Sequence, residues 1–317
     1  MKANKPSATA ILIARSQAML AETQPWAVDE TYKWYYERFV EELGGAFYSP
    51  VVDMLTAMVS FDAQSRLVFT QRLNRRILKI IERCSIPGLY LHFALRKKLI
   101  ESIVQGQIEK GAVKQVVVIA AGFDPLAAAL HKNYPQVRFF ELDHPATQVV
   151  KMAALADAGA NLFFCPADLT TSSITDALAP AWFDASLPTI FIAEGITMYL
   201  DAKQLDKFFA GIRACAKHPD SSLIFTYMAK SPLGVIGFDS QTWMARLWLQ
   251  LKGEPMKWGI EPENIPGFLS ARGFTLHRDY SAADLSARYM STKLLPGGKA
   301  PLLAKGENIC CVNIAKG

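Results

Sequence analysis

The sequence predicts an α/β protein built on a mostly parallel, seven-stranded sheet with a helical region before it. Apolar residues recur at helical spacing up to about residue 110, and after Gly111 short apolar runs alternate with segments of helix length. The chain has 317 residues, of which 51% are hydrophobic, so it carries enough apolar side chains for a large core. It has no repeat of fixed period, which excludes a solenoid.

The first region, residues 1–110, is predicted to be a helical cap. Its helical spacing is clearest at Leu67, Leu73, Ile77, Ile80 and Ile81. Basic residues lie between them, and such a run is typical of a solvated helix face, with an acidic partner or RNA as the alternative. This basic run consists of Arg66, Arg72, Arg75, Arg76, Lys79 and Arg83.

The second region, residues 111–317, is predicted to hold the sheet. Five apolar runs separated by helix-length segments are expected as parallel strands, at 115–121, 137–142, 161–165, 189–193 and 222–227. Two further runs, 273–280 and 308–314, are expected to close the sheet as an antiparallel pair. Between them, 228–266 contains Trp243, Trp248 and Trp258 and is expected to be a helical insertion that covers the end of the sheet, with plain core packing as the alternative.

Composition argues against several classes of ligand and environment. Lys and Arg total 34 against 29 Asp and Glu, and a net charge of +5 is too small to indicate nucleic-acid binding. The five cysteines form no CxxC pair, which argues against zinc and disulfides and favours a reducing cytoplasm. No apolar run approaches the roughly 18 residues of a membrane span, and no signal peptide is evident. Small-molecule chemistry is therefore expected.

Candidate site residues follow the predicted strands, because open α/β sheets bind ligands beyond the carboxyl ends of their strands. The first strand runs into Ala120, Ala121 and Gly122, small residues that let a ligand approach the backbone. A dinucleotide site would need G-x-G-x-x-G, and the single Gly122 argues against a nicotinamide-dependent oxidoreductase, which stays the weaker alternative.

Two acidic residues suggest recognition of adenosine. Asp143 ends the second strand 21 positions after Gly122 and is suited to accept hydrogen bonds from both ribose hydroxyls. Asp168 follows the third strand, where its carboxylate is suited to an exocyclic amine while Leu169 packs on the base. The alternative for Asp168 is that it caps the segment that begins at Thr170.

Two further charged residues suggest an ionic subsite. Glu194 comes directly after an apolar strand and needs a partner, either a structural Arg or Lys or the positive charge of a ligand. Arg96 lies on the helix before the first strand and can form a bidentate contact with a ligand carboxylate, with a solvated helix face as the alternative.

Five separated motifs resemble those of the leucine carboxyl methyltransferase-like group, a branch of the class I S-adenosylmethionine-dependent methyltransferases with a Rossmann-like fold. The matching stretches, in order, are Ser7-x-Thr9-Ala10, Arg96 to Glu101, residues 116–124, Phe140 to Pro145 and Glu194 to Leu200. Three positions depart from the family pattern. Ala120 replaces a glycine and is expected to crowd the cofactor, Lys97 is expected to face solvent, and Glu101 keeps a carboxylate.

The resemblance implies bound S-adenosylmethionine. It implies Arg96 on the methionine carboxylate, Ala120 to Gly122 beneath the methionine and Asp143 on the ribose. It also implies Asp168 and Leu169 around adenine and Glu194 near the amino-acid end. Tyr199 is a candidate for orienting the methyl acceptor.

The predicted reaction is O-methylation of a carboxylate or hydroxyl on a small molecule, aromatic or polyketide-like, bound between the N-terminal helices and the Trp-rich segment. The alternatives are a protein C-terminal carboxylate as acceptor, and a protein that binds S-adenosylmethionine without turnover. No catalytic base stands out, although His92 and His144 are the histidines nearest to the site in sequence.

Overall fold

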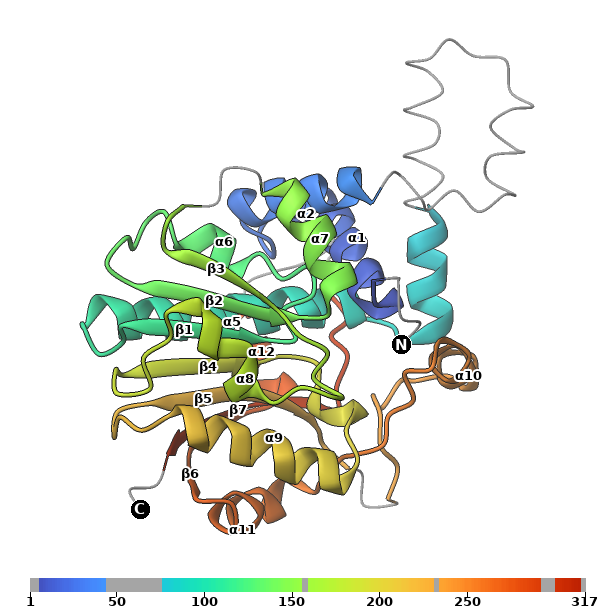
Figure 1. Cartoon of the computed structure of the whole chain (residues 1–317). Coiled ribbons are helices and arrows are strands. Elements are labelled where there is room, and N and C mark those ends of the chain that lie inside the picture. The colour runs from blue at the N-terminus through green and yellow to red at the C-terminus, as the bar shows by residue number, and fades with distance from the viewer. Residues whose placement is uncertain (1–5, 44–75, 156–158, 231–233, 292–299, 315–317) are drawn as a thin grey trace.

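The computed structural model describes residues 6–43, 76–155, 159–230, 234–291 and 300–314, and its centre is a seven-stranded sheet (Figure 1). The strand order is β3-β2-β1-β4-β5-β7-β6. The strands are β1 (Gln115–Ile119), β2 (Arg138–Asp143), β3 (Leu162–Pro166), β4 (Thr189–Ala193), β5 (Ser222–Met228), β6 (Phe274–Tyr280) and β7 (Glu307–Ile314). Each overlaps a run that the sequence predicted, so the predicted fold class is confirmed.

Strand direction decides which residues meet at the functional edge. Strands β1 to β5 pair in parallel, so their carboxyl ends lie together. Strand β7 runs antiparallel to both neighbours, and its first residue, Glu307, pairs with Met228 at the end of β5. The start of β7 therefore lies at the same edge as the ends of the parallel strands.

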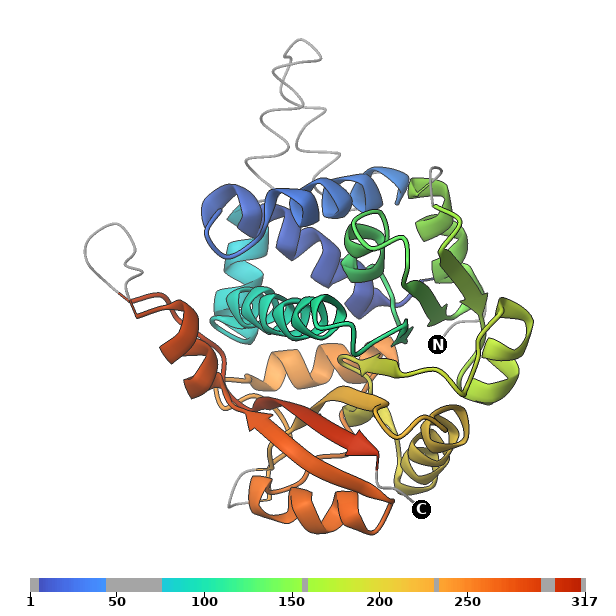
Figure 2. The same cartoon turned by 90° about the vertical axis from the view of Figure 1, so that its left-hand side faces the viewer.

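One face of the sheet is covered by helices from both halves of the chain (Figures 1 and 2). Their side chains form one core with β-strand residues such as Val116 and Ile190. Figure 2 shows α1 and α2, in blue, stacked outside α5. The helices on this face are α1 (Ala8–Thr23), α2 (Glu30–Glu42), α5 (Leu89–Glu109), α6 (Leu126–Leu130), α7 (Pro145–Ala154) and α12 (Ala282–Tyr289).

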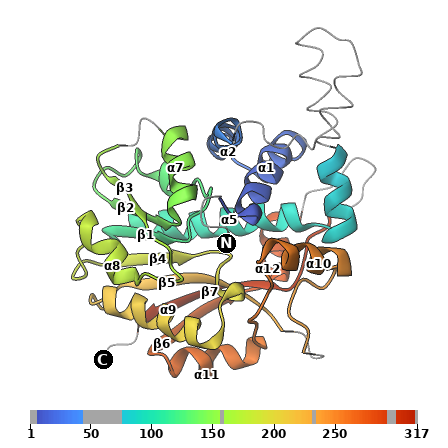
Figure 3. The same cartoon turned by 45° about the vertical axis from the view of Figure 1, so that its right-hand side comes forward.

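The opposite face packs against α8 (Ile174–Leu178), α9 (Ala202–Cys215) and α11 (Ile265–Ser270), as Figure 3 shows. Its core alternates with the first along each strand: Val117 and Ile119 point to this side, and Val116 and Val118 to the other. Helix α9 begins at a reciprocal capping box between Asp201 and Gln204. The sheet is thus buried on both sides, which explains the continuous apolar runs of its central strands.

A third apolar cluster lies at the carboxyl edge. It joins Met198 and Met228 to Phe238, to Tyr90 of α5 and to Ala245 of α10 (Trp243–Lys252). Short 3₁₀ helices complete the connections, at Ala179–Ala181, Thr197–Tyr199 and Pro262–Asn264. This cluster packs the segment after β5 against the N-terminal helices.

Part of the predicted cap lies outside the described residues, including Leu67, Leu73, Arg66, Arg72 and Arg75. In the described helix 76–85, Leu78 is buried whereas Ile80 and Ile81 are exposed, so the predicted apolar face is wrong there. The remaining basic residues of the run, Arg76, Lys79 and Arg83, are exposed, as expected of a solvated face.

The division of the chain at residue 110 into a helical cap and a sheet region stays a prediction. Among the described helices, none combines the length and apolar character needed to cross a membrane.

Candidate functional site

A cavity of about 380 Å³ opens at the carboxyl edge of the sheet. Its walls come from the loops after β1 to β4, from α1 and α5, from the segment around residue 254 and from the start of β7. The structure brings all nine residues of the sequence-based site together here, and what each binds stays a prediction. They are Arg96, Ala120, Ala121, Gly122, Asp143, Asp168, Leu169, Glu194 and Tyr199.

The turn after β1 holds an unusual backbone. Gly122 has φ of 49°, and Ala120 has φ of 55°, a left-handed conformation that costs an L residue roughly 1–2 kcal/mol. Gly122 cannot easily carry a side chain, because a Cβ there would lie 3.3 Å from the Cβ of Ala10. This turn therefore exposes backbone to the cavity, and Ala120 adds a methyl group where the family motif has glycine.

Asp143 is held in place by backbone donors. Its Oδ2 accepts a hydrogen bond from the Gly122 amide at 2.5 Å, and its Oδ1 accepts one from the His144 amide at 2.6 Å. Burial raises the pKa of Asp143, and these hydrogen bonds only partly offset that rise. Each carboxylate oxygen has two lone pairs, so both can still accept a bond from a ligand hydroxyl.

Asp168 caps the segment that begins at Thr170, which was the alternative to adenine binding in the sequence analysis. Its Oδ1 accepts hydrogen bonds from the Thr170 amide at 2.9 Å and from the Thr170 hydroxyl at 2.6 Å, and these bonds lower the pKa of Asp168. The residue also lines the cavity, beside Leu169, so capping and ligand binding are compatible here.

Arg96 and Glu194 face each other inside the cavity. The Nε and one terminal nitrogen of Arg96 donate to Glu194 Oε1 at 2.9 and 2.6 Å. Glu194 thus has the structural cation that the sequence offered as one of two options. The side chain of Arg96 is buried, which excludes the solvated-face alternative.

The prediction that Lys97 faces solvent is wrong. It is only 4% exposed, and its ammonium contacts the carboxylates of Asp124, at 2.5 Å, and of Glu194. Burial alone would lower the pKa of Lys97, but Asp124 and Glu194 raise it above its usual value. Helix α5 explains the error: it is covered on the sheet side and by α1, so consecutive residues are both enclosed.

Sequence reasoning missed Glu307. Both of its oxygens accept bonds from Arg96, at 2.6 and 2.7 Å, and Oε2 lies 2.9 Å from Nε2 of His92. Burial by itself would raise the pKa of Glu307, but Arg96 and His92 together hold it at about 2. The usable signal in the sequence was that Glu307 directly precedes the predicted last strand, 308–314. Because an antiparallel strand begins at the edge where the parallel strands end, a residue at its start must lie at the ligand-binding edge.

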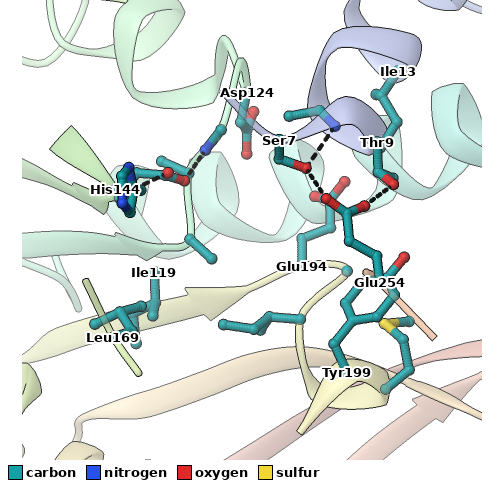
Figure 4. A pocket seen from close by; sticks show the side chains of 18 of the residues that line it. Ser7, Thr9, Ile13, Ile119, Asp124, His144, Leu169, Glu194, Tyr199 and Glu254 are labelled. Atoms are coloured by element: carbon teal, nitrogen blue, oxygen red, sulfur yellow. Dashed lines mark hydrogen bonds between the residues drawn. The ribbon is translucent and has the colours of Figure 1, made fainter. Parts of the chain in front are cut away.

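Glu254 joins the segment after β5 to the start of α1 (Figure 4). Its two carboxylate oxygens accept hydrogen bonds from the Ser7 hydroxyl, at 2.9 Å, and from the Thr9 hydroxyl. Tyr199 lies on the neighbouring 3₁₀ helix beside Glu254, and its pKa is raised, first by burial and then by Glu254 and Glu307. Apolar side chains also line the cavity, namely Ile13, Phe93, Met198, Phe238 and Met256. The last four pack in one apolar cluster with Tyr199.

Two of the three tryptophans expected at the acceptor pocket, Trp243 and Trp258, do not line the cavity. Trp243 is 72% exposed, and Trp258 packs against Tyr227 and Phe268 beneath the opposite face of the sheet. The prediction that these rings form the acceptor pocket is therefore wrong for Trp243 and Trp258. The same segment contributes Phe238 and Met256 instead.

A buried ion pair supports the turn from behind. Lys151 of α7 lies 2.6 Å from a carboxylate oxygen of Glu141 in β2, and both side chains are fully buried. The ammonium of Lys151 also donates to the backbone carbonyl of Asp124 at 2.6 Å. Through Lys151, α7 and β2 fix the loop that carries Asp124 toward Lys97.

Replacement of Ala120 by glycine tests the strain at the turn. We expect Ala120→Gly to leave the protein at least as stable as the wild type, because relief of roughly 1–2 kcal/mol of left-handed strain offsets the added chain entropy. Ala121→Gly is the matched control at an ordinary φ and is expected to destabilise by about 1 kcal/mol. Urea unfolding measures both variants, and a less stable Ala120→Gly would contradict the strain.

Replacement of Glu307 tests the buried charges. Its pKa lies below the ordinary value, so its stabilising contribution is present above about pH 4.5 and is lost as the pH falls toward 2. We expect Glu307→Gln to cost about 3 kcal/mol near neutral pH, because Arg96 loses a buried partner. By about pH 3.5 the difference from wild type should narrow by roughly 1 kcal/mol.

The exposed Glu263→Gln serves as the control for this comparison, with little expected effect at either pH. Denaturant unfolding at the two pH values gives the free energies of unfolding. A deficit of Glu307→Gln that stays constant or widens on acidification would show that Glu307 is not held as a low-pKa carboxylate.

Comparison with known proteins places the chain in a family. The model of the leucine carboxyl methyltransferase family matches residues 36–213. A Bacillus subtilis protein, provisionally named S-adenosyl-L-methionine-dependent methyltransferase YktD, is 25% identical over 202 residues, which is 62% of this chain and 66% of that protein. A protein of a Mycobacterium species with the same provisional description is 24% identical, over 86% of this chain and 84% of its own length.

Solved structures share the fold. A Thermobifida fusca protein provisionally named a methyltransferase superposes with a TM-score of 0.54 at 17% identity, over 76% of this chain and 88% of that one. A DUF574 family protein of Streptomyces avermitilis gives 0.54 at 12% identity, over 76% and 90%. Both support the fold alone. Because the family model spans more than half of its residues, this chain belongs to the leucine carboxyl methyltransferase family.

Proposed function

We propose that this protein is an S-adenosylmethionine-dependent O-methyltransferase that acts on a small molecule and holds its methyl donor in the cavity at the carboxyl edge. Methyltransferase activity follows from the family and from relatives described as S-adenosylmethionine-dependent. The observation that carries the assignment of the cavity is that residues from separate segments, matching separate family motifs, line a single cavity.

The chemistry of the lining fits the proposed donor. Asp143 would hold the ribose, since both of its oxygens keep free lone pairs. Asp168 and Leu169 would bind adenine. The amino-acid end is a zwitterion, and it would insert its ammonium and carboxylate at the facing charges of Glu194 and Arg96. The strained turn at Ala120 would lie beneath the methionine.

When bound, S-adenosylmethionine supplies a methyl group made electrophilic by the adjacent sulfonium. The protein must then align an acceptor with that methyl and exclude water. Glu254 contributes to exclusion, because its bonds to Ser7 and Thr9 hold the segment after β5 against α1 over the cavity. Tyr199 keeps its proton at neutral pH, because its pKa is raised, and is suited to donate a hydrogen bond to an acceptor.

The acceptor is proposed to be a small molecule, and no nucleic acid or membrane takes part. The apolar side chains that line the cavity beside Tyr199, such as Met198 and Phe238, support a partly nonpolar ligand. We place the reaction in the cytoplasm, in keeping with the thiol state suggested by the cysteine pattern. The competing assignments, a protein carboxylate as acceptor and cofactor binding without turnover, concern the same cavity.

Calorimetric titration with S-adenosylmethionine and S-adenosylhomocysteine tests the proposal. We expect micromolar binding to the wild type and a loss of at least about tenfold in Asp143→Ala, which removes the ribose acceptor. Asp176→Ala, at an exposed acid of α8 outside the cavity, should bind as the wild type does. Thermal unfolding checks that both variants are folded.

No binding by the wild type, or equal binding by folded Asp143→Ala, would refute this placement of the donor. Tight NADH binding in the same experiment would revive the oxidoreductase assignment.

A further inference from the structure

We infer that the methyl acceptor is an uncharged, hydroxyl-bearing compound rather than a carboxylate, and that its hydroxyl donates to Glu254, which takes its proton. This inference rests on the proposed function, because it assumes that the methyl donor occupies the same cavity. The supporting observations are the net charge of the side chains that line the cavity and the ion pairs and hydrogen bonds that these side chains already make within the protein.

The cavity has an excess of negative charge. Six carboxylates line it, against three cations, which leaves three net negative charges when histidine is counted as neutral. The carboxylates are Asp124, Asp143, Asp168, Glu194, Glu254 and Glu307, and the cations are Arg96, Lys97 and Lys257. S-adenosylmethionine brings one net positive charge, so the loaded cavity stays negative. An anionic acceptor would enter against that field.

The cations that line the cavity are poorly available to a carboxylate on the acceptor, in addition to the carboxylate of the methyl donor. Arg96 is held by Glu194 on one side and by Glu307 on the other, with four donor–acceptor distances between 2.6 and 2.9 Å. Lys97 already contacts Asp124 and Glu194. Lys257 is exposed at the rim. A buried carboxylate without a cation is strongly disfavoured, whereas a neutral hydroxyl needs only one hydrogen-bond acceptor.

Glu254 is the acceptor best placed for such a hydroxyl. The other lining carboxylates are held by buried cations or by backbone amides, whereas Glu254 accepts bonds only from the Ser7 and Thr9 hydroxyls among its described contacts. Each of its oxygens keeps a second lone pair. Figure 4 shows Glu254 beside Tyr199, and Tyr199 packs against an apolar cluster whose members Met198 and Phe238 also line the cavity. A nonpolar ring or chain can be buried against these side chains.

The step balances without a further reactant. The acceptor oxygen forms a bond to the methyl carbon as the carbon–sulfur bond breaks, and the electron pair of that bond stays on sulfur. The hydroxyl proton passes to the carboxylate of Glu254 and from there to water, since Glu254 is only partly buried. The products are a methyl ether and S-adenosylhomocysteine.

A pair of probes with one ring system and different charge tests the inference. Protein saturated with S-adenosylhomocysteine is titrated at neutral pH with 1-naphthol, which is uncharged, and with 1-naphthoate, which is anionic. We expect 1-naphthol to bind at least about tenfold more tightly. Equal or tighter binding of 1-naphthoate, or binding of neither probe, overturns the inference. The preceding titration with S-adenosylhomocysteine reports separately on the proposed function.

Glu254→Gln tests the named residue, since it removes the charge but keeps the shape. We expect 1-naphthol affinity to fall by about fivefold and 1-naphthoate affinity to rise, because the cavity becomes less negative. Glu261→Gln, a matched change in the same segment that contacts Lys230 outside the cavity, should leave both affinities unchanged. If Glu254→Gln keeps the wild-type ratio of affinities while folded, Glu254 does not receive the hydroxyl.

Discussion

A cluster of buried charges at the carboxyl edge of the sheet is the interaction on which the rest of the site depends. Arg96 and Lys97, adjacent on α5, contact Asp124 after β1, Glu194 after β4 and Glu307 at the start of β7. These contacts connect one helix to three separate places along the sheet edge. Buried charges are costly unless paired, so removal of any member would leave another uncompensated. The cluster therefore fixes the position of α5 over the edge.

The cluster also gives the cavity its electrostatic character. Its cations are engaged by protein carboxylates, so the charge that a ligand meets is set by the acids left in excess. In our proposal, the amino-acid end of the donor lies at the facing charges of Arg96 and Glu194, and the acceptor beside Glu254 is uncharged. Family membership alone does not decide the acceptor, because function depends on the site built on a fold.

Local sequence patterns were enough to predict the strands and the acidic residues at their ends. They were not enough to predict contacts between residues that are far apart in the chain. Alternation of apolar runs was enough to locate β1 to β7, and the rule for carboxyl ends was enough to select Asp143 and Glu194. Lys97 was misjudged because burial on α5 depends on α1, which packs over it from far away in the chain. Glu254 and its hydroxyl partners Ser7 and Thr9 are separated by about 250 positions, so no local pattern links them.

A crystal structure of the protein with S-adenosylhomocysteine would test the central claim most directly. We expect the ribose hydroxyls to lie within hydrogen-bond distance of Asp143, and the amino-acid end to contact Arg96 and Glu194. We also expect adenine to lie beside Leu169. A ligand bound at another part of the sheet edge, or bound here with Asp143 contacting only backbone, would contradict this placement of the donor.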